Sequence, residues 1–243
     1  MYTLNYIHLF LYTFIFSVSY YTTYSVGFPY NMVSAIPLGW VLYAFVTIGH
    51  DCMHDNFSPN VSFNKILSYI CLNGIVMPNH VWMKEHRFHH SNPGHPDDHM
   101  ILDGKYFLDD IKQLLFSKHD IKPIEELSKL PLVIMLVFLP LYCVPIIWIT
   151  TLSSFAYLSL TPHIIDPNIR TLDHTKPKAP EEIAINIFPT SHLYTFIAGG
   201  LNIHATHHMN PRLTRYELML ESINHECKNI HTIKEYWYLL KNR

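Results

Sequence analysis

Charged side chains are scarce in this chain of 243 residues, and two long stretches have none. Asp, Glu, Lys and Arg make up 15% of the residues, against about 25% in soluble domains. None of them precedes Asp51, and none lies between Leu130 and Ile165. The formal net charge of −2 gives no sign of the basic surface that nucleic-acid binding requires. Because water solvates such stretches poorly, the sequence favours an integral membrane protein.

Several cysteine and histidine patterns are also absent. The four cysteines form no C-x-x-C pair, which argues against a disulfide framework. The zinc-protease pattern H-E-x-x-H does not occur. The N-terminus lacks the basic segment of a signal peptide, and its apolar stretch is too long for one. We therefore expect this stretch to be a retained membrane segment.

Long apolar runs predict two transmembrane hairpins. Leu4 to Val26 is uncharged and long enough to cross a hydrocarbon core of about 30 Å as a helix. A turn with Gly and Pro at 27–31 and a second apolar run at 32–49 complete a hairpin over 4–49. The uncharged residues 130–165 are too many for one ordinary span, so we predict a second hairpin there.

The basic residues indicate how these hairpins are oriented. Eight of the 17 Lys and Arg lie in 65–129, and the other nine lie in 170–243. By the positive-inside tendency, the segments 50–129 and 166–243 both face the cytoplasm. The apolar run 66–78 is too short to cross, which predicts a helix at the membrane interface.

These expectations combine into one fold. We predict an all-α integral membrane protein, a single domain over 1–243, with four transmembrane helices in two hairpins. The two cytoplasmic segments would form a helical cap that carries a histidine-rich di-metal site. The tail from Thr214 to Arg243 has apolar residues at roughly helical spacing, which predicts amphipathic helix.

Three histidine sets stand just outside the apolar stretches. Residues at i, i+3 and i+4 share one face of a helix, so each set directs two or three imidazoles the same way. The sets are His50 and His54; His86, His89 and His90; and His204, His207 and His208. Eight imidazoles exceed the three or four ligands of a zinc site and suit two iron ions, with manganese or zinc as alternatives.

The residues around these sets resemble the membrane fatty acid desaturase and hydroxylase superfamily over about 40–215, and a fatty acid desaturase most. His50-Asp51-Cys52-Met53-His54 is similar to the first box of that family, H-D-x-x-H. The second box of the family is similar to Trp82-Met83-Lys84-Glu85-His86-Arg87-Phe88-His89-His90. The acidic residues that follow this box are similar to Pro96-Asp97-Asp98. The third resembles Gly199-Gly200-Leu201-Asn202-Ile203-His204-Ala205-Thr206-His207-His208 with Asn210-Pro211-Arg212.

This resemblance implies a non-haem centre of two iron ions with O2 as co-substrate. The family's ligands correspond to His50, His54, His86, His89, His90, His204, His207 and His208. His163 occupies the place of a ninth ligand in many relatives, with His174 and His192 as weaker candidates. Asp51 and Asp98 match acidic positions of the family and are candidates for hydrogen bonds to the ligands.

The predicted function is O2-dependent desaturation of a long-chain acyl lipid, favoured by Gly199-Gly200-Leu201-Asn202 before the third box. A carotenoid or lipid hydroxylase or ketolase of the same superfamily is the alternative. A non-catalytic metal carrier or transporter is a third reading, but transporters place their ligands near the middle of their spans. The chain has no H-P-G-G haem motif, so we expect a separate electron donor of ferredoxin or cytochrome b5 type.

Overall fold

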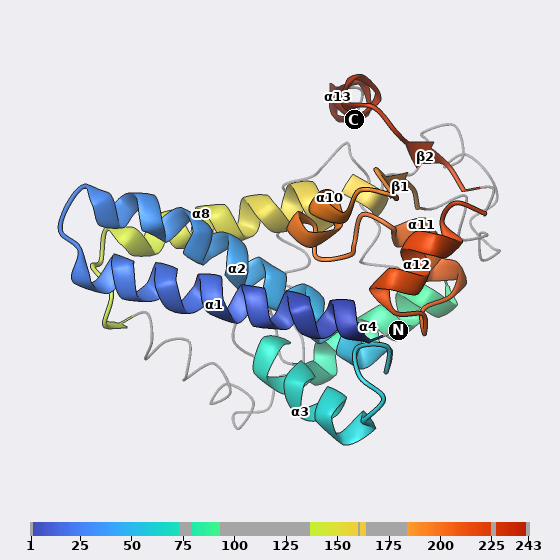
Figure 1. Ribbon diagram of the computed structural model, residues 1–243, viewed down its shortest axis with the longest axis horizontal. Helices are drawn as coiled ribbons and strands as arrows, with labels where there is room; N and C mark the ends of the chain where they lie inside the picture. Colours follow the sequence, from blue (N-terminus) through green and yellow to red (C-terminus); the bar gives the residue numbers. More distant parts are fainter. Residues whose placement is uncertain are drawn as a thin grey trace. The chain divides into compact units, whose positions relative to one another are not determined.

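The computed structural model describes residues 2–72, 79–92, 137–159, 161–163, 184–224 and 227–241. The chain divides into two compact units, one from 1–79 and 121–157 and the other from 80–120 and 158–243. In the first unit lie α1 (Thr3–Ser25), α2 (Tyr30–Met53), α3 (Val61–Leu72) and α8 (Cys143–Ser154). A π-helical turn, η2 (Phe155–Ser159), continues α8 (Figure 1).

The second unit is built from shorter elements. In chain order they are α4 (Asn79–Ser91), the 3-10 turn η3 (Thr161–His163), β1 (Asn186–Ile187), α10 (His192–Ile197), α11 (His204–Met209), α12 (Arg215–Glu221), β2 (Asn229–Ile230) and α13 (Ile233–Lys241). The described residues are thus mostly helical, as predicted. The all-α prediction missed the short parallel pair of β1 and β2, in which Asn186 lies opposite Asn229.

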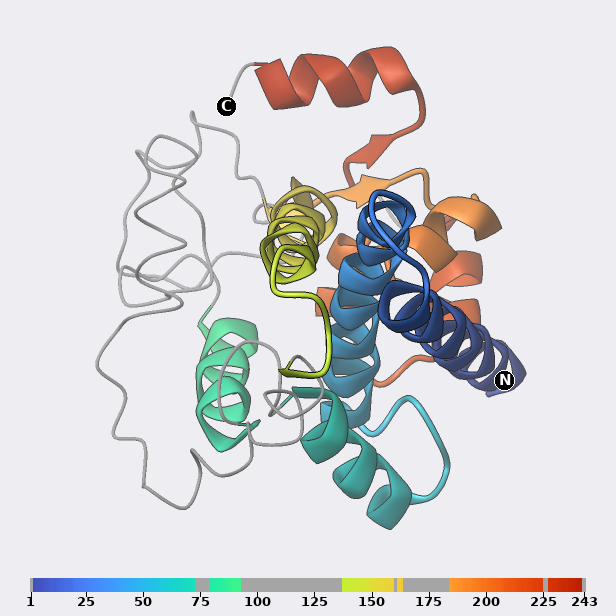
Figure 2. The ribbon, with the colours of Figure 1, turned by 90° about the vertical axis from the view of Figure 1, so that its left-hand side faces the viewer.

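Helix α2 is the centre of the first unit, with α1 and α8 packed on its sides (Figures 1 and 2). It is apolar all round, and most of its second half is buried, as expected for a helix surrounded by others. At Gly39 the backbone of α8 comes so close that a Cβ would meet the Ile147 carbonyl oxygen. The Thr151 hydroxyl donates a hydrogen bond to the Gly39 carbonyl at 2.8 Å, which joins the two helices.

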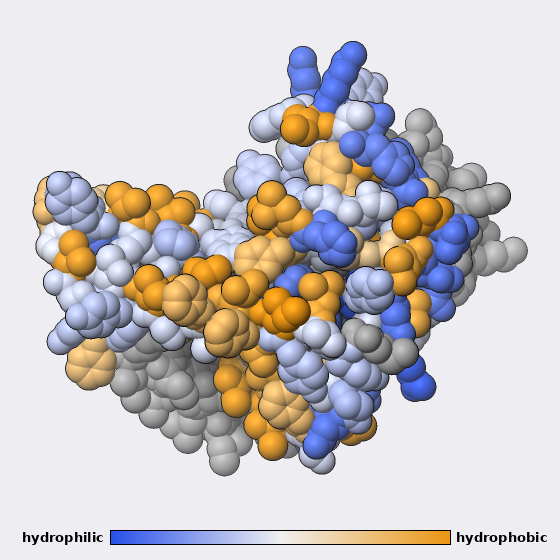
Figure 3. All heavy atoms as spheres, in the orientation of Figure 1, coloured by the Kyte–Doolittle hydropathy of each residue, from blue (hydrophilic) through white to orange (hydrophobic). Residues whose placement is uncertain are grey.

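Helix α1 is polar for a predicted span, and hydrogen bonds within the helix explain how it tolerates that. Hydroxyls one turn apart donate to carbonyls four residues earlier, as Thr13 does to Leu9 and Ser17 to Thr13, both at 2.8 Å. Such bonds lower the cost of placing a hydroxyl in an apolar medium. The exposed face of α1 carries apolar side chains (Figure 3), among them Phe10 and Phe14, both more than half exposed.

Two helices in the described part of the chain are long and apolar enough to cross a membrane: Tyr30–Met53 and Cys143–His163. Residues 4–49 lie in two helices, α1 and α2, that pack against each other, while their arrangement as a transmembrane hairpin stays a prediction. The first part of the segment 66–78 belongs to helix α3, which begins earlier, at Val61, where Asn60 accepts a bond from the Phe63 N–H at 3.0 Å. Its place at a membrane interface stays a prediction. Residues 73–78, and residues 130–136, 160 and 164–165 of the second predicted hairpin, lie outside the described residues.

The predicted amphipathic tail is two helices, α12 and α13, separated by β2. Tyr236 and Leu239 of α13 pack on a cluster of Ile185, Ile187 and Ile230 around the strand pair. Glu235 begins α13 by accepting backbone N–H bonds from His231 and Thr232. These bonds lower the pKa of the Glu235 carboxyl, because they stabilise its charged form.

Candidate metal centre

Helix α4 directs the second histidine set to one side. His86, His89 and His90 follow the i, i+3, i+4 spacing, and the Nε2 atoms of His86 and His90 lie 3.0 Å apart. His86 and His89 are buried, and His90 is half-buried. One turn earlier, the indole of Trp82 lies nearly parallel to the His86 ring, with 6.1 Å between ring centroids. The Trp82 contact supports the orientation of the first imidazole of this set.

Helix α11 carries the third set and is buried along its whole histidine face. His204, His207 and His208 are each less than a tenth exposed. The Nε2 atoms of His204 and His208, one turn apart, lie 2.9 Å from each other. Positive φ angles at Gly199 and Gly200 produce the tight turn that leads the chain into this helix.

Four of these histidines form a buried group inside the second unit: His89, His163, His204 and His208. One ring nitrogen of each lies within 4.8 Å of one from every other member. The Nε2 atoms of His89 and His208 are 3.0 Å apart. His163 comes from η3, and its Nδ1 lies 2.8 Å from the Ser159 carbonyl oxygen. Since a carbonyl can only accept, Nδ1 carries the proton and the Nε2 of His163 keeps its lone pair.

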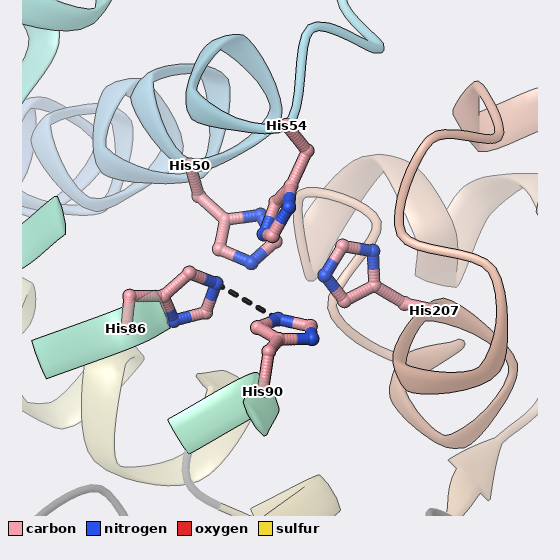
Figure 4. Close-up of side chains that lie close together, drawn as sticks. All are labelled: His50, His54, His86, His90 and His207. Carbon is pink, nitrogen blue, oxygen red and sulfur yellow. Dashed lines mark hydrogen bonds between the residues drawn. The ribbon is translucent and has the colours of Figure 1, made fainter. Parts of the chain in front are cut away.

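A second gathering of imidazoles in the same unit is formed by His86, His90 and His207. Their candidate ligand nitrogens also lie within 4.8 Å of one another, and the ring centroids of His90 and His207 are 5.1 Å apart. Figure 4 shows the two rings from α4 and the ring from α11 turned toward one another. Helix α11 therefore contributes to both gatherings.

The first histidine set ends α2 in the other unit. His50 lies in the last turn of α2 and His54 directly follows the helix, so their rings come from neighbouring turns (Figure 4), with 4.9 Å between centroids. The Nδ1 of His50 is 3.1 Å from a carboxylate oxygen of Asp51. This contact holds the proton on Nδ1 and leaves the lone pair on Nε2.

Hydrogen bonding among the histidines does not by itself account for the four-histidine group. The Nε2 of His208 lies within 3.0 Å of two other Nε2 atoms, those of His89 and His204. A neutral imidazole nitrogen holds either one proton or one lone pair, so a single N–H or a single lone pair would have to be shared between both neighbours. A bound metal ion removes the conflict, because every nitrogen then offers its lone pair to the same centre.

The distances also fit a metal ion. Two nitrogens bound at right angles, with bonds of about 2.1 Å, lie ~3.0 Å apart, and at a tetrahedral angle they lie ~3.4 Å apart. The Nε2 pairs of the second unit are separated by 2.9 to 3.0 Å. The donor set is all nitrogen, without thiolates, which suits iron among other first-row metals.

The structure thus brings seven of the nine predicted ligands together in one unit, including His163, and places His50 and His54 at the end of α2 in the other. His192 begins α10 and belongs to neither gathering. Asp98 and His174 lie outside the described residues.

Two buried asparagines beside the third set also shape the site. Asn186 and Asn202 are fully buried, and each holds the backbone around α11 through its side-chain amide. Asn202 stands in the third box itself. Asn186 lies 20 residues from its partner Thr206, and because nothing in the local sequence marks it, the sequence alone did not predict it.

Residues 28–116 match the family model described as fatty acid desaturase. This part of the chain is similar to the fatty acid desaturase family. The match contains the first two histidine sets of the desaturase pattern, while the third set lies beyond it. The third set lies outside the match, but the structure provides separate evidence that it belongs to the same site. In the second unit, His207 and His208 of α11 lie beside His90 and His89, which the match contains.

Plant desaturases are among the similar proteins. A probable fatty acid desaturase of Sorghum bicolor is 38% identical over 72 residues, which are 28% of this chain and 19% of that protein. An sn-2 acyl-lipid omega-3 desaturase (ferredoxin), chloroplastic, of Helianthus annuus is 37% identical over 60 residues, 25% of this chain and 14% of that protein. An omega-3 fatty acid desaturase, chloroplastic, of Ricinus communis is 35% identical over 74 residues, 28% of this chain and 16% of that protein. The chain spans less than a fifth of each relative's length.

Proposed function

We propose that this protein is an O2-dependent fatty acyl desaturase with a histidine-ligated pair of iron ions. The observation that carries the proposal is the buried group of four imidazoles, His89, His163, His204 and His208, in a chain whose residues 28–116 match the fatty acid desaturase family. The ligand number, the nitrogen donors and the short Nε2 separations support iron over a closed zinc site.

Each gathering of imidazoles is assigned one iron. The four-histidine group holds the first. His86, His90 and His207 are assigned to the second iron. His50 and His54, the remaining ligands that the resemblance implies, are assigned to it as well, because the first group already has four imidazoles. Asp51 supports His50 by accepting from its Nδ1, and Asp98 is proposed for a similar role. His163, fixed through the Ser159 carbonyl, is the ninth ligand.

In this reaction the protein binds the iron ions, orients the imidazole rings and excludes water from the centre. When bound, the iron pair supplies O2 activation for removal of two hydrogens from adjacent carbons of the acyl chain. The products are a cis double bond and two waters, and two electrons and two protons from a donor complete the balance. Burial of the four-histidine group excludes solvent from the reacting carbons, and the bonds from Nδ1 atoms to Asp51 and Ser159 orient the rings.

The apolar helices support a membrane setting for this reaction. We propose four spans in two hairpins, with both polar segments on the cytoplasmic side and a long-chain acyl lipid as substrate. Electrons come from a separate partner of ferredoxin or cytochrome b5 type. The name of the Helianthus annuus relative includes ferredoxin, which supports a donor of ferredoxin type.

The test is the fatty acid profile of a host that expresses the protein beside one that expresses His89→Ala. His89 is completely buried in the four-histidine group, so its loss removes a ligand of one iron. We expect new double bonds with the natural sequence, and with H89A only the profile of the host without the protein. The exposed His231 belongs to neither gathering, and H231A serves as the control that retains activity.

The lipid profile also separates the alternatives. Oxygenated lipids or carotenoids, together with unchanged fatty acids, would show that the centre catalyses hydroxylation or ketolation and not desaturation. Normal product from H89A, at a membrane content equal to that of the natural sequence, would refute the metal assignment.

A further inference from the structure

The N-terminus of α11 is capped by a residue far away in the sequence. The first N–H groups of a helix have no partner inside the helix, and the residue before the helix usually supplies one from its side chain. At α11 that residue is Ile203, which makes no such bond. Instead, the N–H of Thr206, in the first turn, donates to the side-chain oxygen of Asn186 at 3.2 Å.

The same amide makes two further bonds that fix its direction. The Asn186 Nδ2 donates to the Thr206 hydroxyl at 3.0 Å and to the Asn229 side-chain oxygen at 2.9 Å. Asn186 is completely buried, so each of these bonds is made without competition from water. Its side chain therefore connects α11 to β2 through one rigid amide.

The backbone around Asn186 is held as firmly as its side chain. Asn186 donates its N–H to the Lys228 carbonyl at 3.0 Å, and Ile187 donates to the Asn202 carbonyl at 2.7 Å. Asn202 in turn donates from its side chain to the Ile187 carbonyl at 3.1 Å and to the Thr195 hydroxyl at 3.1 Å. Asn186 thus projects from a backbone that is bonded on both sides.

Helix α11 needs such external support. It has six residues, far fewer than an isolated helix requires for stability in water. Three of those residues are histidines, shared between the two gatherings of imidazoles. Thr206 lies between them and binds Asn186 through both its N–H and its hydroxyl, so these two bonds fix the rotation of the helix about its axis. Ligand atoms must be held to about 0.5 Å for a metal site to form.

We propose that Asn186 is a positioning residue that sets the metal affinity of the centre through Thr206. The inference rests on the proposed function, since it assumes that the imidazoles of α11 bind metal. Residues that orient metal ligands typically contribute 10- to 100-fold in affinity. Asn186 touches no imidazole in the bonds described above and acts through the placement of α11.

The experiment is a Co2+ titration of the purified full-length protein after removal of its metal, followed by the visible absorption of the bound ion. Asn186→Leu keeps the approximate size of the side chain and removes all three side-chain bonds. We expect it to weaken Co2+ binding on the order of 10-fold or more and to change the absorption bands, because the ligand geometry loosens. Asn186→Asp keeps an acceptor for the Thr206 N–H, and we expect it to recover most of the affinity.

Thr214→Ala is the matched control. Thr214 caps α12 in the same unit, accepting from the Glu217 N–H while Glu217 accepts from the Thr214 N–H. Removal of this cap destabilises a helix of similar length that carries no imidazole, so the Co2+ affinity and spectrum of T214A should match the natural sequence. If N186L does not fold, Thr206→Val tests the same contact: it keeps the cap, loses the hydroxyl bond, and should weaken Co2+ binding by a smaller factor.

The outcomes separate the two proposals. Equal loss of affinity in N186L and T214A, or natural affinity in N186L and T206V, would overturn the positioning role and leave the metal centre in place. A natural protein that takes up neither Co2+ nor iron would overturn the proposed function, and the role of Asn186 with it.

Discussion

Gly200, four residues before the first ligand of α11, is required by both its backbone conformation and its surroundings. Its φ angle is +86°, and an added Cβ would lie 3.0 Å from the Cδ and Nε atoms of Arg215. Arg215 is only 2% exposed, so its side chain has little space to move aside. A left-handed conformation alone costs a residue with a Cβ roughly 1–2 kcal/mol.

We therefore predict that Gly200→Ala lowers the free energy of unfolding by about 1–3 kcal/mol. The measurement is denaturant unfolding of the purified protein in detergent. Gly27→Ala is the control, because a Cβ there meets nothing within 4 Å, and it should leave the stability nearly unchanged. Equal stability of the two variants would contradict the packing of Arg215 over Gly200.

For individual residues, the sequence predicts those positions that depend only on spacing along a helix. The imidazoles of α4 and α11 share faces because i, i+3 and i+4 do so on any helix. Asn186 could not be predicted in the same way, because its partners Thr206 and Asn229 are 20 and 43 residues away. Such bonds depend on which segments pack together, and a single sequence does not state this.

Among the helices of the first unit, α2 and α8 approach each other closely at Gly39. A Cβ at Gly39 would meet the Ile147 carbonyl oxygen and would lie 2.8 Å from the Thr150 Cβ. Both neighbours belong to the framework of α8 and cannot rotate away, unlike the end of a long side chain. Replacement of Gly by Ala favours a helix by about 1 kcal/mol, and overpacking costs about 1–3 kcal/mol.

The cost of overpacking should exceed the gain in helix propensity. We therefore predict that Gly39→Ala destabilises the first unit by about 1–2 kcal/mol. Unfolding in detergent, followed by tryptophan fluorescence, measures the change. Ser17→Ala on the exposed side of α1 gains helix propensity without a clash, so it should be neutral or slightly stabilising. A G39A protein as stable as S17A would show that the two helices can separate without cost.

The helices themselves were easier to predict than their ends. Apolar runs indicated α1, α2 and α8 because burial of such runs requires regular hydrogen bonding. The start of α3 was placed too late, because Asn60 and its bond to the Phe63 N–H lie outside the apolar run. The two-residue strands β1 and β2 have no periodicity to detect, and β2 divides the tail that the sequence analysis treated as continuous amphipathic helix.

In the whole molecule, the two units contain different numbers of the candidate ligands. Seven candidate ligands belong to the second unit, and His50 and His54 belong to the first. Long-range contacts determine this division, so neither composition nor spacing could reveal it. The second unit holds the four-histidine group and, in its other gathering, three imidazoles.

The proposed function makes a distinct prediction for each of these sets. The double variant His50→Ala/His54→Ala should retain the iron of the four-histidine group and lose the other, so the iron content should fall from about two per chain to about one. Elemental analysis of the purified protein measures this directly. The control is His192→Ala/His231→Ala, which removes two imidazoles outside both gatherings and should keep about two. An iron content near two in the first variant would exclude the α2 histidines as ligands, and a content near zero would mean that the second unit cannot hold metal without them.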